Sequence, residues 1–253
     1  MKTDICLVAC DLNPTYIDFY PLVKKFWFEK TNIQTKLILI SDFIPDQLIS
    51  FKDDIILFHP IENIPTPFQA QCIRILYPSL LNQYENGIIL SDMDLIPMNN
   101  DFYIKNIENV NDNDTFVVYR NVIEEHKQYP ICFCNATSKI WKEIFQINNT
   151  QDIIHTLSNW YFNLPVNDYK LSDPFSIGWA MDQLKLFEYV NKWNGKKLLL
   201  NDYNNGFNRL DRNDISKTNI QKIKENIKNN IYSDFHLLRP YSIYKNILDF
   251  LLD

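Results

Sequence analysis

The chain has 253 residues, of which 46% are hydrophobic and 14% aromatic, so it can form one large α/β domain or two small ones around a sizeable core. Its formal net charge of −6 argues against nucleic acid as the main partner, so any bound phosphate must be held by local cations or a metal. The four glycines form neither a G-x-G-x-x-G fingerprint nor a Walker loop, which excludes both glycine-based phosphate motifs.

The first half of the chain alternates predicted strands with predicted helices. Four apolar runs have the length of strands: Ile5–Cys10, Lys36–Ile40, Ile55–Phe58 and Ile88–Leu90. Two helical patterns, each preceded by a capping residue and a proline, lie between them at Tyr16–Phe28 and Phe68–Tyr77. Strands that are apolar throughout and alternate with helices are typical of a parallel sheet covered on both faces.

In such sheets, ligands bind beyond the carboxyl ends of the strands. Three strand ends carry polar residues, namely Asp11–Asn13, Ser41–Asp42 and Asp92–Asp94. We therefore expect these residues along one edge of the sheet, which favours a site over a solvated loop for the last pair of acids.

The second half has a mixed pattern. Its predicted strands are Phe116–Tyr119, Ile131–Cys134 and Leu198–Leu200. Its predicted helices include Ser138–Ile147, Gln151–Phe162, Asn219–Asn230 and Ile243–Leu252. Between residues 176 and 193, apolar residues recur at helical spacing and leave Trp179, Asp182 and Gln183 off the core stripe. The polar run from Asn204 to Arg212 is either a lid over a site or a solvated connection.

The cysteines and the hydropathy pattern bear on location. The five cysteines lack the spacing of zinc ligands, and Cys132 and Cys134 are expected to share one face of a strand as buried free thiols. An odd number of cysteines suggests a reducing compartment. No stretch reaches 18 apolar residues, and Ile5–Cys10 is too short for a signal peptide, so the sequence predicts a cytoplasmic protein without a membrane span.

The stretch Gly87–Pro97 combines a turn, a buried strand and two acids one residue apart. Asn86 and Gly87 supply the turn, and Pro97 limits how far regular strand pairing continues. Two carboxylates at the end of a buried strand are costly unless something compensates them. A divalent cation that carries a phosphorylated ligand would do so, because hard cations take carboxylate oxygens.

His236, Arg239 and Arg74 could complete such a site. Asp92, Asp94 and His236 provide two carboxylates and an imidazole, a ligand set that suits Mn²⁺ or Mg²⁺. A lone histidine is a weak ligand signal, and a structural role is its alternative. Arg239 lies close to this histidine in the sequence, and a guanidinium can bind a phosphate through two hydrogen bonds. Arg74, on an otherwise apolar helix, either extends towards solvent or faces the same edge.

Asp92-Met93-Asp94 after a buried strand resembles the DxD motif of GT-A fold glycosyltransferases. The arginine-bearing helix Gln71–Pro78 and the strand Gly87–Leu90 are similar to those of glycogenin-like and bacterial galactosyltransferase-like enzymes, and to the glycosyltransferase domain of an algal-virus protein that builds capsid glycans. His236 matches the metal-binding histidine that these families carry late in the domain, and Trp179–Gln183 is similar to their W-x-x-D-Q segment. The resemblance is one of motif order and covers most of the chain.

This resemblance implies a metal-dependent enzyme that moves a sugar from a nucleotide-diphosphate donor, most often UDP-linked, to a glycan or another hydroxyl acceptor. It implies the GT-A fold, an α/β fold whose mostly parallel central sheet is flanked by helices and has a mixed second half. Residues 1–253 would form one catalytic domain, with a nucleotide-binding half over 1–98 and an acceptor half over 99–253 that carries the metal histidine and a terminal helix. The algal-virus relative raises a virus-encoded protein acting in the host cytoplasm as one alternative origin.

The resemblance also implies roles for individual residues. Asp94 would be the main ligand of Mn²⁺ or Mg²⁺ and His236 the second, while Asp92 would bind the metal or the donor. Asp182 would be the general base of an inverting reaction or would bind donor or acceptor hydroxyls in a retaining one; a helix-surface acid or cap is its alternative. Arg74 is the second implied catalytic residue, and with Arg239 it would neutralise the charge of the phosphates. Implied donor contacts come from Ala9, Asp11, Asn13, Tyr16, Arg74, Ser91, Asp92, Met93 and Arg239. Implied acceptor contacts come from Trp179, Asp182 and Gln183.

Two other functions are compatible with a strand that ends in D-x-D. In a haloacid-dehalogenase-like phosphotransferase, Asp92 would attack a phosphate and Asp94 would act as the acid or base. Against it, about three strand–helix units precede the motif, and Leu95-Ile96 replaces the small residues expected there. A non-catalytic nucleotide-sugar binding module would keep the donor edge without using Asp182. The sugar, the acceptor, the stereochemical course and the oligomeric state stay open.

Overall fold

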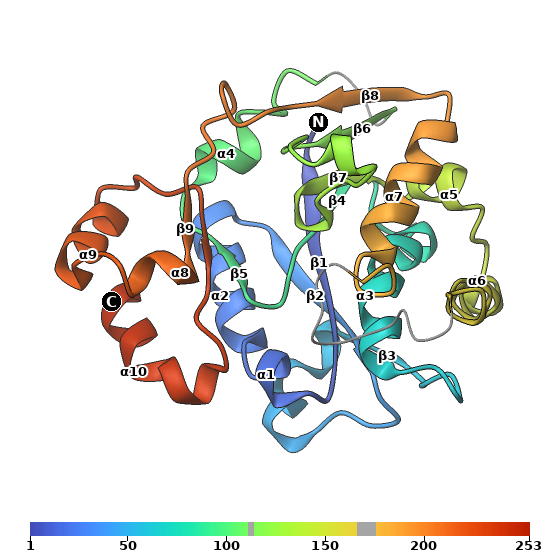
Figure 1. Ribbon diagram of the computed structural model, residues 1–253, viewed down its shortest axis with the longest axis horizontal. Coiled ribbons are helices and arrows are strands. Elements are labelled where there is room, and N and C mark those ends of the chain that lie inside the picture. Colours follow the sequence, from blue (N-terminus) through green and yellow to red (C-terminus); the bar gives the residue numbers. More distant parts are fainter. Residues whose placement is uncertain (111–113, 166–175) are drawn as a thin grey trace.

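The computed structural model describes residues 1–110, 114–165 and 176–253 (Figure 1). Within them, seven strands form a sheet in the order β3-β2-β1-β4-β7-β6-β8. The first four strands in chain order are parallel: β1 (Thr3–Asp11), β2 (Gln34–Ile40), β3 (Ile55–Phe58) and β4 (Gly87–Leu90). The expected parallel first half is therefore confirmed. Strands β1, β2 and β4 are largely buried on both faces, whereas β3 lies at the end of the strand order and buries only Phe58.

The rest of the sheet is mixed, as expected. Strand β7 (Cys134–Thr137) runs antiparallel to β4 and to β6 (Thr115–Val118), and β8 (Lys196–Leu199) runs parallel to β6. A second sheet joins three short strands in the order β5-β10-β9, with bounds Leu95–Pro97, Asp234–His236 and Arg209–Asp211. The sequence patterns did not predict these short strands, because three residues are too few to show a period of two.

Helices cover both faces of the large sheet. On one face lie α3 (Thr66–Leu76), α5 (Ser138–Phe145), α6 (Thr150–Phe162) and α7 (Met181–Lys192). The other face packs against α2 (Tyr20–Thr31), α4 (Asn100–Ile104) and the short sheet. Successive residues of β1 alternate between the two cores, Ile5 and Leu7 on one side and Cys6 and Val8 on the other, as the period of a strand requires.

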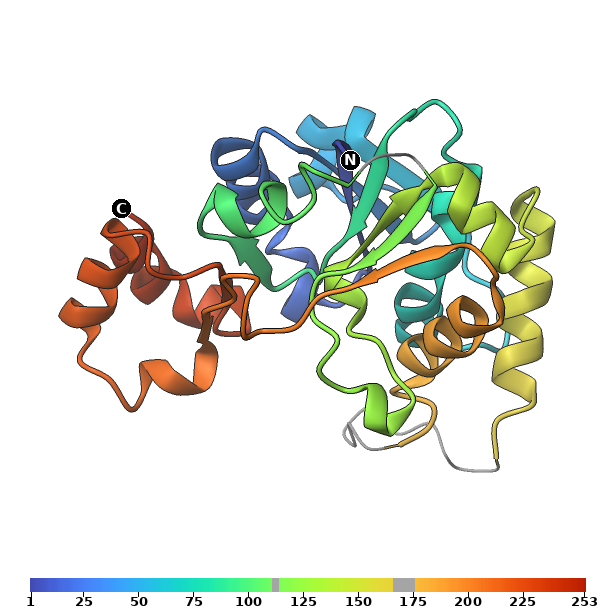
Figure 2. The same ribbon diagram turned by 90° about the horizontal axis from the view of Figure 1, so that it is seen from above.

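The C-terminal part extends beyond the sheet at one end. Helices α8 (Arg212–Ile215) and α9 (Ile220–Lys228) lie between β9 and β10 in the chain, and α10 (Tyr241–Leu252) follows β10. Helices α9 and α10 project from the rest of the molecule (Figure 2). Ile223 of α9 and Leu248 and Leu251 of α10 join the core beneath the short sheet. This packing anchors the chain on both sides of β10.

Local signals explain where several helices begin, and one of them differs from the expectation. The side chain of Asn13 caps α1 (Pro14–Ile17) by accepting a hydrogen bond from the backbone of Thr15, as Asn13-Pro14 predicts. The predicted helix over Tyr16–Phe28 is divided, because α1 ends at Ile17 and α2 starts at Tyr20. Thr66 begins α3, but its hydroxyl donates to Asp11 Oδ2 at 2.8 Å and does not cap the helix.

The predicted strand over Ile131–Cys134 is wrong. Residues Ile131–Phe133 form a short 3₁₀ helix after Pro130, and the strand β7 begins at Cys134. Asn135 concealed this strand, because a buried amide is unusual at the centre of a sheet; its side chain donates to Thr3 Oγ1 at 2.7 Å. Cys132 and Cys134 consequently pack into opposite cores and do not share a strand face.

Further short 3₁₀ helices are found at Asp46–Asp54, Tyr77–Leu80 and Glu124–His126. All five cysteines are buried free thiols, as expected. None of the helices in the described part of the chain has both the length and the apolar character needed to cross a membrane.

Candidate functional site

Strands β1 and β4 are parallel neighbours, and Leu90 at the carboxyl end of β4 lies opposite Leu7, four residues before the end of β1. The turn that carries Asp92 and Asp94 follows β4 directly, and the chain then enters β5. Strand β5 pairs antiparallel with β10, which places Leu95 opposite His236, and Leu237 N donates to Asp94 O at 2.8 Å. The short sheet therefore brings a histidine from late in the chain to the two acids.

Asp94 is the centre of a buried group of charges. Its side chain is 4% exposed, and Oδ2 accepts hydrogen bonds from Arg212 Nη2 at 2.7 Å and Arg239 Nη1 at 3.2 Å. Its Oδ1 lies 3.6 Å from His236 Nε2. Burial favours the neutral acid, but His236 and the two arginines outweigh it and hold the pKa of Asp94 well below its usual value.

His236 is held from its other side. Its Nδ1 lies 3.2 Å from Asp211 Oδ2, because the parallel pairing of β10 with β9 sets these two residues opposite each other. The other oxygen of Asp211 accepts the backbone N–H of Asn213 at 2.9 Å and caps α8. A carboxylate on Nδ1 fixes the ring and leaves Nε2 as the atom that faces Asp94.

Asp92 belongs to a different group of charges. It forms an ion pair with Arg74 Nη1, and Arg74 Nη2 donates to Asp182 Oδ2 at 3.1 Å. The same guanidinium also donates to the carbonyl of Ser91 at 3.1 Å. Burial opposes ionisation of Asp92, but Arg74 outweighs it and lowers the pKa of Asp92. Arg74 thus faces the edge of the sheet that carries the two acids and does not extend towards solvent.

Asp182 lies on α7 and is 3% exposed. Its position off the apolar stripe had left open a helix-surface acid, but the structure buries it against Arg74 instead. Burial raises the pKa of Asp182 to about 6, although Arg74 and the backbone N–H of Gln183 oppose the shift. A carboxyl group with this pKa can accept or release a proton near neutral pH.

The remaining predicted site residues occupy different settings. Tyr16 accepts a hydrogen bond from Arg239 at 2.6 Å, which connects α1 to the Asp94 group. Asp11 is nearly buried and accepts from the backbone of Asn13 and the hydroxyl of Thr66. Ala9 is half-buried in β1.

Ser91 and Met93, on either side of Asp92, are buried, and Met93 packs in the apolar core. On the acceptor side, Trp179 and Gln183 are half-buried, and the carbonyl of Trp179 lies 3.5 Å from Gln71 Nε2. These residues frame the edge on which Asp92 and Asp182 lie.

The predicted three-ligand metal site is divided in this structure. Asp94 and His236 face each other, whereas Asp92 is paired with Arg74. In residues 1–110, 114–165 and 176–253, no group of three or more His, Cys, Asp or Glu side chains is arranged to hold a metal ion. The facing carboxylate and imidazole nevertheless fit a divalent cation in chemistry and separation, so two of the three expected donors suit the ion.

Sequence reasoning missed Asp211, Arg212 and Thr66. The first two lie in the polar run that was interpreted as a lid or a connection, and they belong to β9 and α8. Asp211 two residues before Asn213 is a capping signal, but nothing in the sequence indicates that β9 pairs with β10. Arg212 carries no local signal for its contact with Asp94.

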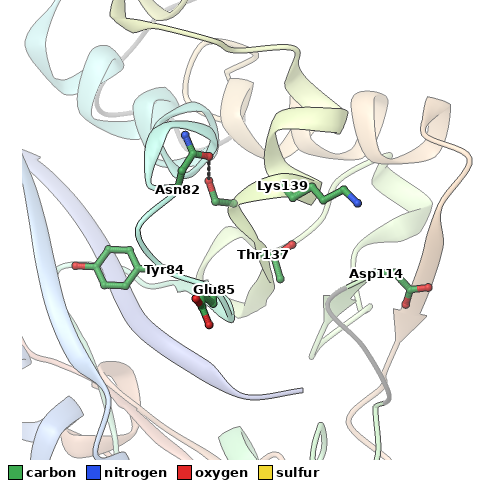
Figure 3. Close-up of a pocket in the computed structure, with 7 residues that line it drawn as sticks. Asn82, Tyr84, Glu85, Asp114, Thr137 and Lys139 are labelled. Carbon is green, nitrogen blue, oxygen red and sulfur yellow. Dashed lines mark hydrogen bonds between the residues drawn. The ribbon is translucent and has the colours of Figure 1, made fainter.

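A separate hollow of about 740 Å³ lies away from this group of charges (Figure 3). It is lined by Asn82, Tyr84, Glu85, Asp114, Thr137, Ser138 and Lys139. Glu85 precedes β4 and Asp114 precedes β6, so the hollow is at the amino ends of these strands. None of the predicted site residues lines it, and ligands of parallel sheets bind at the opposite edge.

No protein-family model and no curated protein matches this chain. Among solved structures, it is similar to the glycosyltransferase GlyE of Streptococcus pneumoniae TIGR4, with a TM-score of 0.53 and 13% identity over 99% of this chain and 61% of that one. For the galactosyltransferase LgtC with donor and acceptor sugar analogues, the TM-score is 0.48 at 9% identity, over 100% of this chain and 97% of that one. For a glycosyltransferase involved in glycosylation of the major capsid of PBCV-1, it is 0.46 at 9% identity, over 99% of this chain and 100% of that one.

At 13% identity, the likeness to GlyE shows the fold alone. Together with the mostly parallel sheet and its mixed second half, it confirms the prediction of a GT-A-like glycosyltransferase fold. The chain spans about three-fifths of the length of GlyE.

Proposed function

We propose that this chain is a glycosyltransferase that moves a sugar from a nucleotide-diphosphate donor, UDP-linked, to a hydroxyl of a glycan or another acceptor. The observation that carries the proposal is the convergence of Arg74, Arg212 and Arg239 on Asp92 and Asp94 at the carboxyl ends of β1 and β4. In a chain of net charge −6, this brings three guanidinium groups, each paired with a carboxylate, to the edge where parallel sheets bind ligands. A diphosphate has the charge and the geometry to bind guanidinium groups.

Asp94 and His236 would hold Mn²⁺ or Mg²⁺, with Asp92 completing the set or binding the donor. When bound, the ion would stabilise the negative charge on the departing nucleoside diphosphate. The side chains of this protein would bind the nucleotide and the acceptor sugar. Arg239 and Tyr16 would meet the nucleotide from the β1 side, and Trp179 and Gln183 would meet the acceptor sugar from the α7 side.

Asp182 would act on the sugars. The bond from the anomeric carbon to the phosphate oxygen breaks, and a bond from the same carbon to the acceptor oxygen forms. In an inverting course, Asp182 would take the acceptor proton, which its pKa of about 6 permits at neutral pH. In a retaining course, the same carboxylate would orient a sugar hydroxyl. Arg74 would keep Asp182 in position through the 3.1 Å hydrogen bond.

The test is turnover of a panel of UDP-sugars with Mn²⁺, with release of UDP and transfer to a glycan acceptor as the readouts. We expect one donor to be turned over, and Asp94→Asn to reduce the rate by about 100-fold or more. Asp101→Asn is the matched control, because Asp101 is an exposed acid on α4 that pairs only with Lys105 among its described partners, and this variant should keep full activity.

Three results would contradict the proposal. Failure of every nucleotide and nucleotide-sugar to bind would remove the donor. Saturable UDP binding without turnover would leave a binding module. An aspartyl phosphate trapped at Asp92 would indicate a phosphotransferase, a function that the fold does not favour.

A further inference from the structure

Arg212 lies in the space between the two metal donors proposed above. It is the first residue of α8, directly after β9, and its side chain is 14% exposed. Its Nη2 donates to Asp94 Oδ2 at 2.7 Å and also contacts His236 Nε2. The guanidinium therefore binds the same carboxylate and the same ring nitrogen that would coordinate a divalent ion.

The surroundings of His236 make this position a cation site. Asp211 Oδ2 lies 3.2 Å from Nδ1 of His236, which leaves Nε2 of the ring facing the Asp94 carboxylate. The Asp94 carboxylate requires compensation by cations, because an uncompensated carboxylate that is 4% exposed is strongly destabilising. Arg212 and Arg239 both supply a positive charge to Asp94, but of these two only Arg212 also contacts His236.

The other end of the guanidinium has a free bonding capacity. Arg212 Nη1 is buried and makes no hydrogen bond within the described part of the chain. A buried donor without a partner is costly, so Arg212 is not fully satisfied where it lies. An anionic ligand at this edge, such as the diphosphate of the proposed donor, would give Nη1 a hydrogen-bond partner. Its negative charge would also replace that of Asp94 as the partner of the Arg212 guanidinium.

We propose that Arg212 is the resident cation of the Asp94–His236 pair and that a divalent ion must displace it in order to bind. The inference rests on the proposed function, since it concerns the metal site of the proposed transferase. It follows that the protein binds a divalent ion weakly in the absence of nucleotide, because each binding event must break the contacts of Arg212 with Asp94 and His236.

The experiment measures binding of Mn²⁺ alone to the full chain, from the electron paramagnetic resonance signal of the free ion. We expect Arg212→Met, which keeps an apolar stem of similar length, to bind Mn²⁺ at least tenfold more tightly than the unaltered protein. Arg239→Met is the matched control: it removes one positive charge from the same Asp94 oxygen but none from His236. Because Arg239 does not contact both donors, its removal should tighten binding by less than that of Arg212.

A second variant locates the ion. Adding Asp94→Asn to Arg212→Met should abolish the gain, and circular dichroism verifies that each variant is folded. The inference is overturned if Arg212→Met binds Mn²⁺ no more tightly than the unaltered protein, if Arg239→Met has an equal or larger effect, or if the gain persists without Asp94. Sugar transfer with an unchanged Mn²⁺ affinity would contradict only this inference, whereas tighter Mn²⁺ binding without any donor turnover would contradict only the proposed function.

Discussion

Arg74 Nη2 donates to Asp182 Oδ2 at 3.1 Å, and through this bond helix α3 is joined to helix α7 at the edge of the sheet. The same guanidinium is paired with Asp92 after β4. Its side chain is 10% exposed and that of Asp182 is 4% exposed, so neither charge is well solvated. One arginine therefore compensates two carboxylates, of which Asp182 is buried and Asp92 half-buried.

Replacing Arg74 should lower the stability of the protein, because two carboxylates lose their common partner. Arg74→Met leaves Asp92 and Asp182 without their common partner, and we expect it to lower the free energy of unfolding by about 3 to 5 kcal/mol. The double variant Arg74→Met, Asp182→Asn should recover at least about 1 kcal/mol of this loss, because it removes one of the two stranded charges. Urea unfolding at pH 7 measures both. Strict additivity of the two substitutions would contradict the pairing.

The raised pKa of Asp182 predicts a specific dependence of stability on pH. Its folded value of about 6 lies above the ordinary value of about 3.9, so the folded protein binds more protons than the unfolded chain between these values. This contribution favours folding at low pH and is lost as the pH rises through about 6. The free energy of unfolding of Asp182→Asn, relative to that of the unaltered protein, should therefore rise by roughly 2 kcal/mol from pH 4.5 to pH 7.5.

Urea unfolding of both proteins at these two pH values checks this prediction. The lowered pKa values of Asp92 and Asp94 act in a lower window, because such groups lose stability only as the pH falls below about 4. A constant difference between the two proteins across the range would show that Asp182 does not titrate there.

A hydrogen bond between Thr66 and Asp11 joins the start of α3 to the end of β1. Thr66→Val leaves Asp11 Oδ2 without this donor, and we expect a loss of about 1.5 kcal/mol in the free energy of unfolding. Thr66→Ser keeps the hydroxyl and should lose less than half as much. Thermal or urea unfolding separates the two, and equal losses would attribute the effect to packing of the methyl group.

Arg209 and Asp234 form an ion pair between β9 and β10, and its two members differ in burial. The Arg209 side chain is 20% exposed, whereas Asp234 is fully buried and its pKa is raised by that burial. Arg209→Met should therefore destabilise the protein by about 3 kcal/mol or more, because it strands the buried carboxylate.

Asp234→Asn should destabilise it by clearly less, because Arg209 can still reach solvent and lies over the ring of Phe133 at 5.2 Å. Urea unfolding of both variants measures the difference. The opposite order of the two losses would show that burial does not decide the energy of this pair.

Several features followed from the sequence because their causes are local. The apolar runs of β1, β2, β3 and β4 need only their own residues to indicate strands, and the alternation with helices indicates a parallel sheet. Asn13-Pro14 indicates a helix start through a hydrogen bond two residues away. The two acids after β4 follow from the same local logic, since ligand sites of parallel sheets lie at the strand ends.

What surrounds those acids was decided by the tertiary structure. The strands β5, β9 and β10 are three residues each, too short for a pattern, yet their pairing sets His236 opposite Leu95 and Asp211. Asn135 hid the strand β7 in the same way, because its amide nitrogen donates to Thr3, which is 132 residues away in the sequence. Such partners are separated by many residues, and no periodicity of one segment can report them.

By itself, the sequence determined the parallel half of the sheet and placed Asp92 and Asp94 at its carboxyl edge. Only the tertiary structure decided that Arg74 pairs with Asp92 and Asp182, whereas Arg212, Arg239 and His236 surround Asp94. The physical reason is the range of the interactions. Hydrophobic periodicity is written in neighbouring residues, but a buried charge is compensated by whichever group the fold brings within about 3 Å of it.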